Sequence, residues 1–257
     1  MEETLGNKIA EIMYRLADYY FMKAMLLSFV AGAFLILFIL KKHPALRREL
    51  WTKYVVYILV VLVSSVSILS NLWLWWLGIV CAVGFYELIR VSHTSEAKEN
   101  LPQVLLLYLV WCGGAFFLAF HAQRYLFWVY ALVVLFDGFS QLAGLLIGKY
   151  KLAPQTSPAK TWEGLAGGFL AVLITLLILP GSFKADMILF ALALALLVTL
   201  GAVAGDLLAS KWKRVAGVKD YGNWIPAHGG MLDRFDSFIG AAGLIGGVYA
   251  IILPFLE

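Results

Sequence analysis

Apolar stretches long enough to cross a lipid bilayer recur along almost the whole of this 257-residue chain. A helix needs about 20 mostly apolar residues to span the hydrocarbon core, where every backbone polar group must be paired within the protein. The composition, 62% hydrophobic and 14% charged, agrees with repeated spans. We therefore predict an all-α, polytopic integral membrane protein. The eight candidate spans are residues 22–40, 54–70, 72–89, 101–120, 125–147, 164–180, 186–206 and 237–256.

Little of the chain is left outside these spans. Residues 5–20 are expected to form either an interfacial helix or part of a ninth span. Nothing outside the membrane is long enough for an independent domain with its own core. We divide the chain into an N-terminal membrane region, 1–124, and a C-terminal catalytic membrane region, 125–257. The second region contains two polar loops, 148–163 and 205–237.

The basic residues predict how the spans are oriented. With eight spans, the loops after the first, third, fifth and seventh share one side of the membrane and hold 15 of the 20 Lys and Arg. Basic loops mark the cytoplasmic side, so both termini are expected outside. The cations are split between loops with no interleaved exposed aromatic residues, so nothing indicates a nucleic-acid-binding surface, and none is expected. A basic side also suits the anionic headgroups of membrane lipids.

Four aspartates alternate with basic residues in the loop 205–237. Carboxylates are hard oxygen ligands for a divalent cation, and lysines and arginines neutralise phosphate charge. A glycine pair among them permits a close backbone approach. The order favours a site for a metal bound to a polyphosphate over a solvated loop whose opposite charges merely pair. The residues concerned are Asp206, Lys211, Lys213, Arg214, Lys219, Asp220, His228, Gly229, Gly230, Asp233, Arg234 and Asp236.

A second polar cluster precedes the sixth span. Ser157 followed by Pro158 predicts the N-cap and the first residue of a helix. Lys160 and Thr161 would then lie in its first turn, where free backbone N–H groups and the helix dipole favour an anion. This pattern predicts a phosphate cradle. The alternative is an ordinary capped membrane helix whose lysine extends to the interface.

Asp137 falls in the middle of the fifth span, where an ionisable residue is costly and indicates function. Gln141 lies on the same helix face, four residues further on, with Ser140 nearby. Two interpretations remain open. Asp137 either lines the wall of a substrate cavity, or is a buried polar group that bridges helices or subunits.

The two polar segments resemble the signature of the phosphatidate cytidylyltransferases, also called CDP-diacylglycerol synthases. Trp212 stands where that family usually has an aliphatic residue or Phe, while Tyr221 and Ala227 replace a common Ser and Gly. None of these departures removes a charged group. The resemblance rests, in the family's order and spacing, on Ser157, Pro158, Lys160, Thr161, Glu163, Gly164, Ser210, Lys213, Arg214, Lys219, Asp220, Gly222, Pro226, His228, Gly229, Gly230, Asp233, Arg234 and Asp236.

This resemblance implies that CMP passes from CTP to phosphatidate, with Mg²⁺ as cofactor and a homodimer as the assembly. We expect Asp206 and Asp233 to hold the metal with support from Asp236, and the site allows a second cation. The residues expected to be catalytic are Lys213, Arg214, Lys219, Asp220, His228 and Arg234. The residues expected to contact substrates are Ser157, Lys160, Thr161, Ser210, Gly229, Gly230 and Asp137.

A bacterial-type cytoplasmic (inner) membrane, with the site facing the cytoplasm, is the expected location. Two rival functions remain. One is another CTP-dependent lipid enzyme, either with a different lipid-phosphate acceptor or a polyprenol-type kinase. The other is a transporter in which Asp137 and Asp206 carry ions. A transporter often has inverted repeats with broken helices near the membrane midplane, whereas these polar groups gather in one half of the chain.

Overall fold

A computed structural model describes residues 2–42, 45, 47–178, 185–225 and 229–255. The described part is almost entirely helical, which confirms the all-α class. Six of its helices are long and apolar enough to cross a membrane, and α5 is a shorter apolar helix. The protein is therefore an integral membrane protein. In chain order the elements are α1 (Glu2–Lys42), α2 (Arg47–Leu69), α3 (Trp73–Val91), α4 (Ser95–Ile147), β1 (Lys151–Ala153), β2 (Ser157–Thr161), α5 (Trp162–Ile178), α6 (Ala185–Val215), α7 (Leu232–Ile252) and the 3₁₀ turn η2 (Leu253–Phe255).

The helices overlap all eight predicted spans, but two spans share one element. Helix α4 contains a kink at Ala122, where φ is −153° and ψ is 66°, so it consists of two legs. These legs correspond to the predicted spans 101–120 and 125–147. Residues 5–20 belong to the continuous helix α1 and form no separate interfacial helix. The count of eight spans, and the division of the chain near residue 124, stay predictions.

Helix α6 continues well past the end of the predicted span at residue 206, as far as Val215. Asp206 therefore lies inside a helix, and not at its end as the expected span boundary placed it. Ser210 and Lys213, one and two turns further on, are helical as well. A single helix thus fixes the spacing of Asp206, Ser210 and Lys213.

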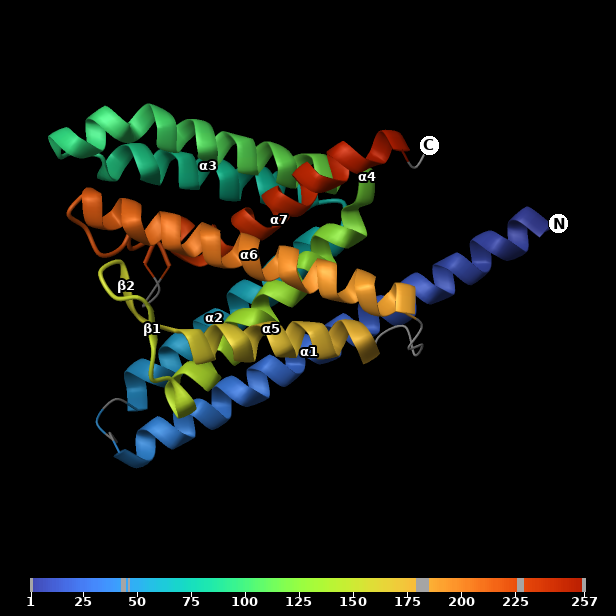
Figure 1. The fold of residues 1–257 in the computed structure, drawn as a ribbon, viewed down its shortest axis with the longest axis horizontal. Coiled ribbons are helices and arrows are strands. Elements are labelled where there is room, and N and C mark those ends of the chain that lie inside the picture. The colour runs from blue at the N-terminus through green and yellow to red at the C-terminus, as the bar shows by residue number, and fades with distance from the viewer. Residues whose placement is uncertain (1, 43–44, 46, 179–184, 226–228, 256–257) are drawn as a thin grey trace.

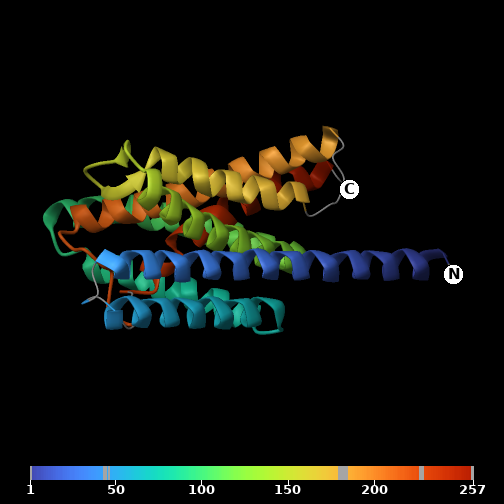
Figure 2. The same ribbon diagram turned by 90° about the horizontal axis from the view of Figure 1, so that it is seen from below.

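The segments that connect the helices on the basic side gather at one end of the molecule. Figure 1 shows the β1–β2 hairpin, the junction of α3 with α4 and the segment between α6 and α7 at this end. The start of α1 and the end of α7 lie at the opposite end, and Figure 2 shows the same arrangement from below. The helix order therefore places the predicted basic loops together, as a positive-inside topology requires.

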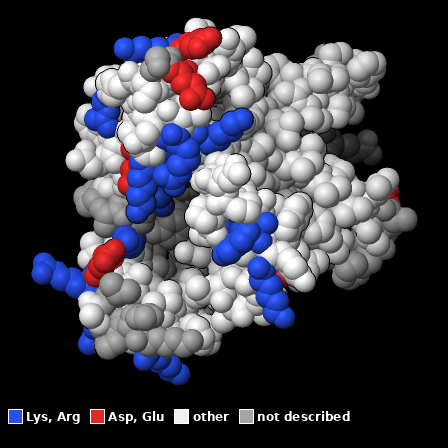
Figure 3. All heavy atoms as spheres, turned by 60° about the vertical axis from the view of Figure 1, so that its left-hand side comes forward, with Lys and Arg blue, Asp and Glu red and all other residues white. Residues whose placement is uncertain are grey.

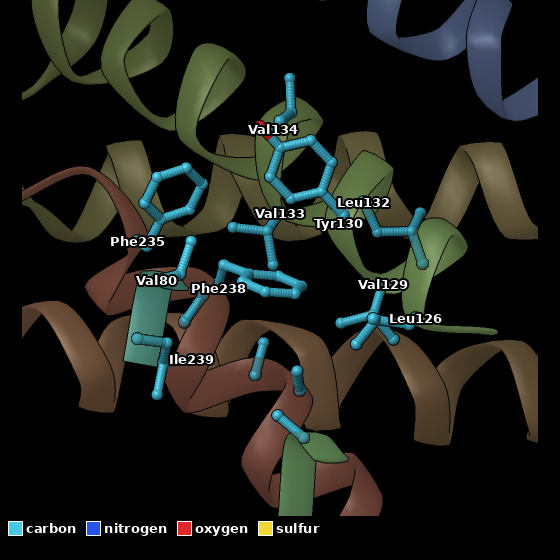
Figure 4. Close-up of a cluster of buried hydrophobic side chains, with 14 of the residues drawn as sticks. Val80, Leu126, Val129, Tyr130, Leu132, Val133, Val134, Phe235, Phe238 and Ile239 are labelled. Carbon is cyan, nitrogen blue, oxygen red and sulfur yellow. The ribbon is translucent and has the colours of Figure 1, made fainter. Parts of the chain in front are cut away.

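Helix α7 runs through the core of the bundle between α4 and α6. Aromatic and aliphatic side chains of the second leg of α4 pack against its first half, with Tyr130 beside Phe238 at a ring distance of 5.3 Å (Figure 4). Glycines permit backbone contact on both sides of α7. Gly205 of α6 touches the backbone of Asp236, and Gly114 of α4 touches Gly246. Small residues at such crossings allow membrane helices to pack closely.

The segment predicted to open the sixth span forms a hairpin. Strand β2 pairs antiparallel with β1, with Lys151 opposite Thr161 and Ala153 opposite Ser157. Helix α5 begins at Trp162, and the Thr161 hydroxyl accepts the N–H of Gly164 at 3.1 Å. The predicted N-cap at Ser157 is therefore wrong, since Thr161 is the capping residue. Lys160 lies in the strand before the helix and not in its first turn.

Candidate active site

Asp233 joins three parts of the predicted motif. Its Oδ1 accepts a hydrogen bond from Lys213 Nζ at 2.6 Å. Its Oδ2 accepts the backbone N–H groups of Tyr221 at 2.7 Å and Gly230 at 2.8 Å. The side chain is only 1% exposed. Because both oxygens have donors, one carboxylate ties the end of α6 and the following loop to the start of α7.

Glu87 of α3 anchors the same loop from the other side. This fully buried carboxylate accepts the backbone N–H groups of Met231 at 3.0 Å and Leu232 at 2.8 Å, so it caps the N-terminus of α7. Free N–H groups at a helix start favour a negative charge. Arg90, one turn further along α3, donates to the carbonyl of Tyr221 at 2.5 Å. The position of an acidic and a basic residue at the end of the predicted span 72–89 was the only signal in the sequence, and it did not reveal their partners.

The glycine pair allows the backbone to approach these two carboxylates. Gly229 has a φ of 86°, in the left-handed region that a residue with a β-carbon adopts only under strain. A β-carbon at Gly230 would collide with the carboxylate of Glu87. The pair therefore shapes the loop around Glu87 and Asp233, while its contact with a substrate phosphate stays a prediction.

Tyr221 fills the space beneath the loop. Its side chain is fully buried and its hydroxyl donates to the carbonyl of Ala209 at 2.9 Å. Burial raises the pKa of the Tyr221 hydroxyl well above its usual range, so the group remains a protonated donor. Tyr221 therefore holds the loop between α6 and α7 in two ways, through its backbone N–H to Asp233 and through its side-chain hydroxyl to Ala209.

Lys160 brings the hairpin onto α6. Its ammonium forms an ion pair with Asp206 Oδ2, and both side chains are 24% exposed. The other oxygen of Asp206 accepts a hydrogen bond from Ser210 at 3.1 Å, one turn further along α6. Two segments that lie far apart in the sequence thus meet, as the sequence predicts for Lys160, Asp206 and Ser210. We call these residues, together with the Lys213–Asp233 pair, the charged cluster.

Two further aspartates were predicted as site residues. Asp236 is buried on α7, three residues after Asp233, and accepts the N–H of Ser237 at 2.7 Å. Its backbone packs against Gly205 of α6, the residue next to Asp206. Asp137 lies on the second leg of α4, and its side chain is exposed. Both interpretations of Asp137, as the wall of a substrate cavity or as a bridge between helices or subunits, stay predictions.

The remaining predicted residues are more peripheral or lie outside the described part. Arg214, Lys219, Asp220 and Arg234 are exposed around the cluster. Figure 3 shows Lys and Arg side chains gathered on this end of the molecule. His228 falls outside the described residues. Ser157 is half-buried on β2, and its contact with a substrate stays a prediction.

Metal binding depends on the carboxylates of the cluster. Among the described residues, no three His, Cys, Asp or Glu side chains converge closely enough to hold a metal ion by themselves. Mg²⁺ commonly uses only one or two protein carboxylates together with substrate phosphates and water. Asp206 and Asp233 each have a lysine ammonium on one oxygen, the position that a cation would take. Carboxylates are the right kind of ligand for Mg²⁺, but binding would require both lysines to exchange partners, so the metal site stays a prediction.

The fold and the site define a class of protein: a polytopic membrane protein with paired lysines and carboxylates at its basic end. A family model described as "Cytidylyltransferase family" matches residues 9–252, nearly the whole chain. The protein thus belongs to the cytidylyltransferase family.

Curated relatives agree with this assignment. The chain is 40% identical over 161 residues to a protein of Staphylococcus haemolyticus, which covers 59% of this chain and 62% of the relative. A protein of Staphylococcus epidermidis is 41% identical over 175 residues, 64% of this chain and 67% of its own. One of Staphylococcus aureus is 39% identical over 160 residues, 59% and 62% of the two chains. All three are named "Phosphatidate cytidylyltransferase", and the matched part is less than two thirds of the first and third.

Proposed function

We propose that this protein transfers CMP from CTP to phosphatidate and releases CDP-diacylglycerol and pyrophosphate. The observation that carries the proposal is that α6 holds two lysine–carboxylate pairs two turns apart, Lys160–Asp206 and Lys213–Asp233, near the basic end of the bundle. The family and the names of the relatives support it. Nothing in the described residues favours a transporter or a different CTP-dependent lipid enzyme.

The reaction needs no activated side-chain nucleophile. The phosphate monoester of phosphatidate would attack the α-phosphorus of CTP, forming a P–O bond, while the bond to the β-phosphate oxygen breaks and pyrophosphate leaves. The main demands are alignment of two polyanions and neutralisation of their charge. Lys160 and Lys213 would contact phosphates directly, with Arg214, Lys219 and Arg234 around the rim.

A bound Mg²⁺ would neutralise triphosphate oxygens and stabilise the leaving pyrophosphate. We propose that Asp206 and Asp233 hold it, with Asp236 in support, and the site allows a second cation. Their lysine partners then become available for substrate phosphates. Asp233 has a second role, because it also holds the loop amides of Tyr221 and Gly230.

The proposed location is a bacterial cytoplasmic membrane, with the site on the cytoplasmic side where CTP is present. The gathering of the basic loops at one end supports this orientation. The homodimer implied by the family resemblance stays a prediction.

The test uses purified protein, phosphatidate and CTP labelled at either the α- or the γ-phosphate, with Mg²⁺ present or withheld. Cytidylyl transfer puts the α-label into the lipid and the γ-label into pyrophosphate. A lipid kinase puts the γ-label into the lipid and leaves the α-label in CDP. Transfer of the γ-label to the lipid, or no transfer of either label, would refute the proposal.

A further inference from the structure

Two adjacent arginines begin α2 at the end of the molecule where the basic loops gather. Arg47 and Arg48 are exposed, and Figure 1 shows the start of α2 at this end. Cations in the first turn of a helix oppose the helix dipole, which favours negative charge there. The stability of α2 therefore does not explain why both arginines stand at this position.

Neither arginine has an acidic partner among the described residues. Glu49 is the acidic residue of the same turn, and its carboxylate accepts a hydrogen bond from Lys53 Nζ at 2.6 Å. The ion pairs between described residues do not include Arg47 or Arg48. The two guanidinium groups thus present positive charge that an anionic group from outside the chain can neutralise.

The face of α2 that carries the arginines forms an open hollow of about 720 Å³, which we call the α2 hollow. From the first arginine to the last valine its lining follows α2 for about 14 Å along the helix axis. Over this length the lining changes from charged, through aromatic and hydroxyl side chains, to aliphatic. On α2 the hollow is lined by Arg47, Arg48, Trp51, Thr52, Val55 and Val56.

The tryptophan of the hollow packs on a residue that is tied to α1. The Trp51 ring lies edge-on to the Tyr54 ring at a distance of 5.7 Å, and the Tyr54 hydroxyl donates to the carbonyl of Phe29 at 2.5 Å. Tryptophan in membrane proteins prefers the level between lipid headgroups and acyl chains. Trp51 therefore marks this level, with the arginines on the headgroup side and the valines on the acyl side.

The order of these groups fits a phospholipid with a negative charge. Guanidinium groups bind phosphate oxygens through paired hydrogen bonds, and basic pockets at the cytoplasmic face of membrane helices bind anionic headgroups. A nucleotide would place its polar base edges along Val55 and Val56, where the side chains offer no hydrogen bond. The hollow also shares no residue with the charged cluster.

We propose that the α2 hollow is a binding site for an anionic glycerophospholipid, separate from the charged cluster. Arg47 and Arg48 bind the lipid phosphate, and an acyl chain lies along Val55 and Val56. The bound lipid holds the start of α2 at the membrane surface and stabilises the folded protein. The site needs neither CTP nor CMP transfer, so the inference is independent of the proposed function.

The test measures thermal unfolding of the full-length protein in micelles of a neutral detergent with increasing amounts of phosphatidylglycerol. This lipid is anionic, but its phosphate is already a diester, so it is no acceptor in the proposed reaction. We expect a saturable rise of the unfolding temperature. Phosphatidylcholine with the same acyl chains has no net charge, and soluble glycerol 3-phosphate has no acyl chains. Neither should give a comparable rise.

A double variant, Arg47→Gln with Arg48→Gln, tests the arginines. It should raise the amount of phosphatidylglycerol needed for half of the rise about 10-fold or more, as the loss of charge-assisted contacts to phosphate predicts. The matched control is Lys149→Gln with Lys151→Gln, which removes the same charge from two exposed residues of the basic end outside the hollow. It should keep the wild-type curve.

Each outcome supports or overturns the inference. An equal rise with phosphatidylcholine or with glycerol 3-phosphate, or a rise that does not saturate, would overturn it on the wild type alone, so a misfolded arginine variant leaves the test intact. An unchanged curve for the arginine variant would overturn it as well. An equal loss in the lysine control would assign the effect to the whole basic surface and would also refute a site in the α2 hollow.

Discussion

The carboxylate of Glu87 accepts the backbone N–H of Leu232 at 2.8 Å, across a separation of 145 residues in the sequence. Through this bond, α3 holds the start of α7 and thereby fixes where Asp233 points. Within the described part of the chain, the hydrogen bonds of the Glu87 carboxylate go to the backbone of Met231 and Leu232. We therefore assign it a positioning role.

Replacement of Glu87 should lower both the stability of the protein and its catalytic activity. In the wild type, each oxygen of the Glu87 carboxylate accepts one backbone N–H. Glu87→Gln keeps the shape of the side chain, but its NH₂ group replaces one of these oxygens and cannot accept a hydrogen bond. A lost charge-assisted hydrogen bond with an unpaired buried donor predicts a stability loss of about 1–3 kcal/mol. Thermal unfolding in detergent measures this loss. A matched change at exposed Glu99 of α4 is the control, and equal stability of the Glu87→Gln variant and the wild type would contradict the assigned role.

Asp206→Asn and Asp233→Asn should differ in stability although both stop turnover. Each removes a proposed metal ligand and should lower the rate at least about 100-fold. Only Asp233 also accepts two loop amides, so only Asp233→Asn should clearly lower the unfolding temperature. Parallel activity and unfolding measurements check this. Near-normal turnover in either variant would remove that residue from the metal site.

Lys160→Ala should lower catalytic efficiency about 10- to 100-fold, because a charge-assisted contact to phosphate is worth about 1.5–3 kcal/mol. Lys160→Arg should recover part of the loss, since its planar guanidinium does not replace a compact ammonium. Lys151→Ala, an exposed lysine of the same hairpin, is the control and should have little effect. Separate KM values for CTP and phosphatidate identify the phosphate involved. Full efficiency of Lys160→Ala toward both substrates would leave the hairpin with a structural role only.

Cysteine labelling tests the orientation of the basic end. Single cysteines at Gln155 and Asn223 should react with a membrane-impermeant reagent only from the cytoplasmic side, and one at Asn71 only from outside. All three positions are exposed, whereas native Cys81 and Cys112 are buried and should not interfere. Labelling of positions 155 and 223 from opposite sides would rule out a single site.

Features encoded by local sequence were predictable, and those that depend on distant partners were not. Apolar length located the helices, and the order of charged residues identified both halves of the cluster. The cap of α5 was misplaced because the pairing of Lys151 with Thr161 extends the chain before the helix. The end of α6 was misplaced because hydropathy marks where a segment leaves the membrane, while a helix continues through charged residues. The acceptor role of Glu87 was missed because its partners lie 144 and 145 residues away.

Cytidylyl transfer by this protein is tested most directly by the stoichiometry of products that wild-type and Asp206→Asn protein form from CTP and phosphatidate with Mg²⁺. We expect equal amounts of CDP-diacylglycerol and pyrophosphate from the wild type, and a loss of both of at least about 100-fold in the folded variant. Formation of CDP in place of pyrophosphate, or undiminished product from Asp206→Asn, would contradict it.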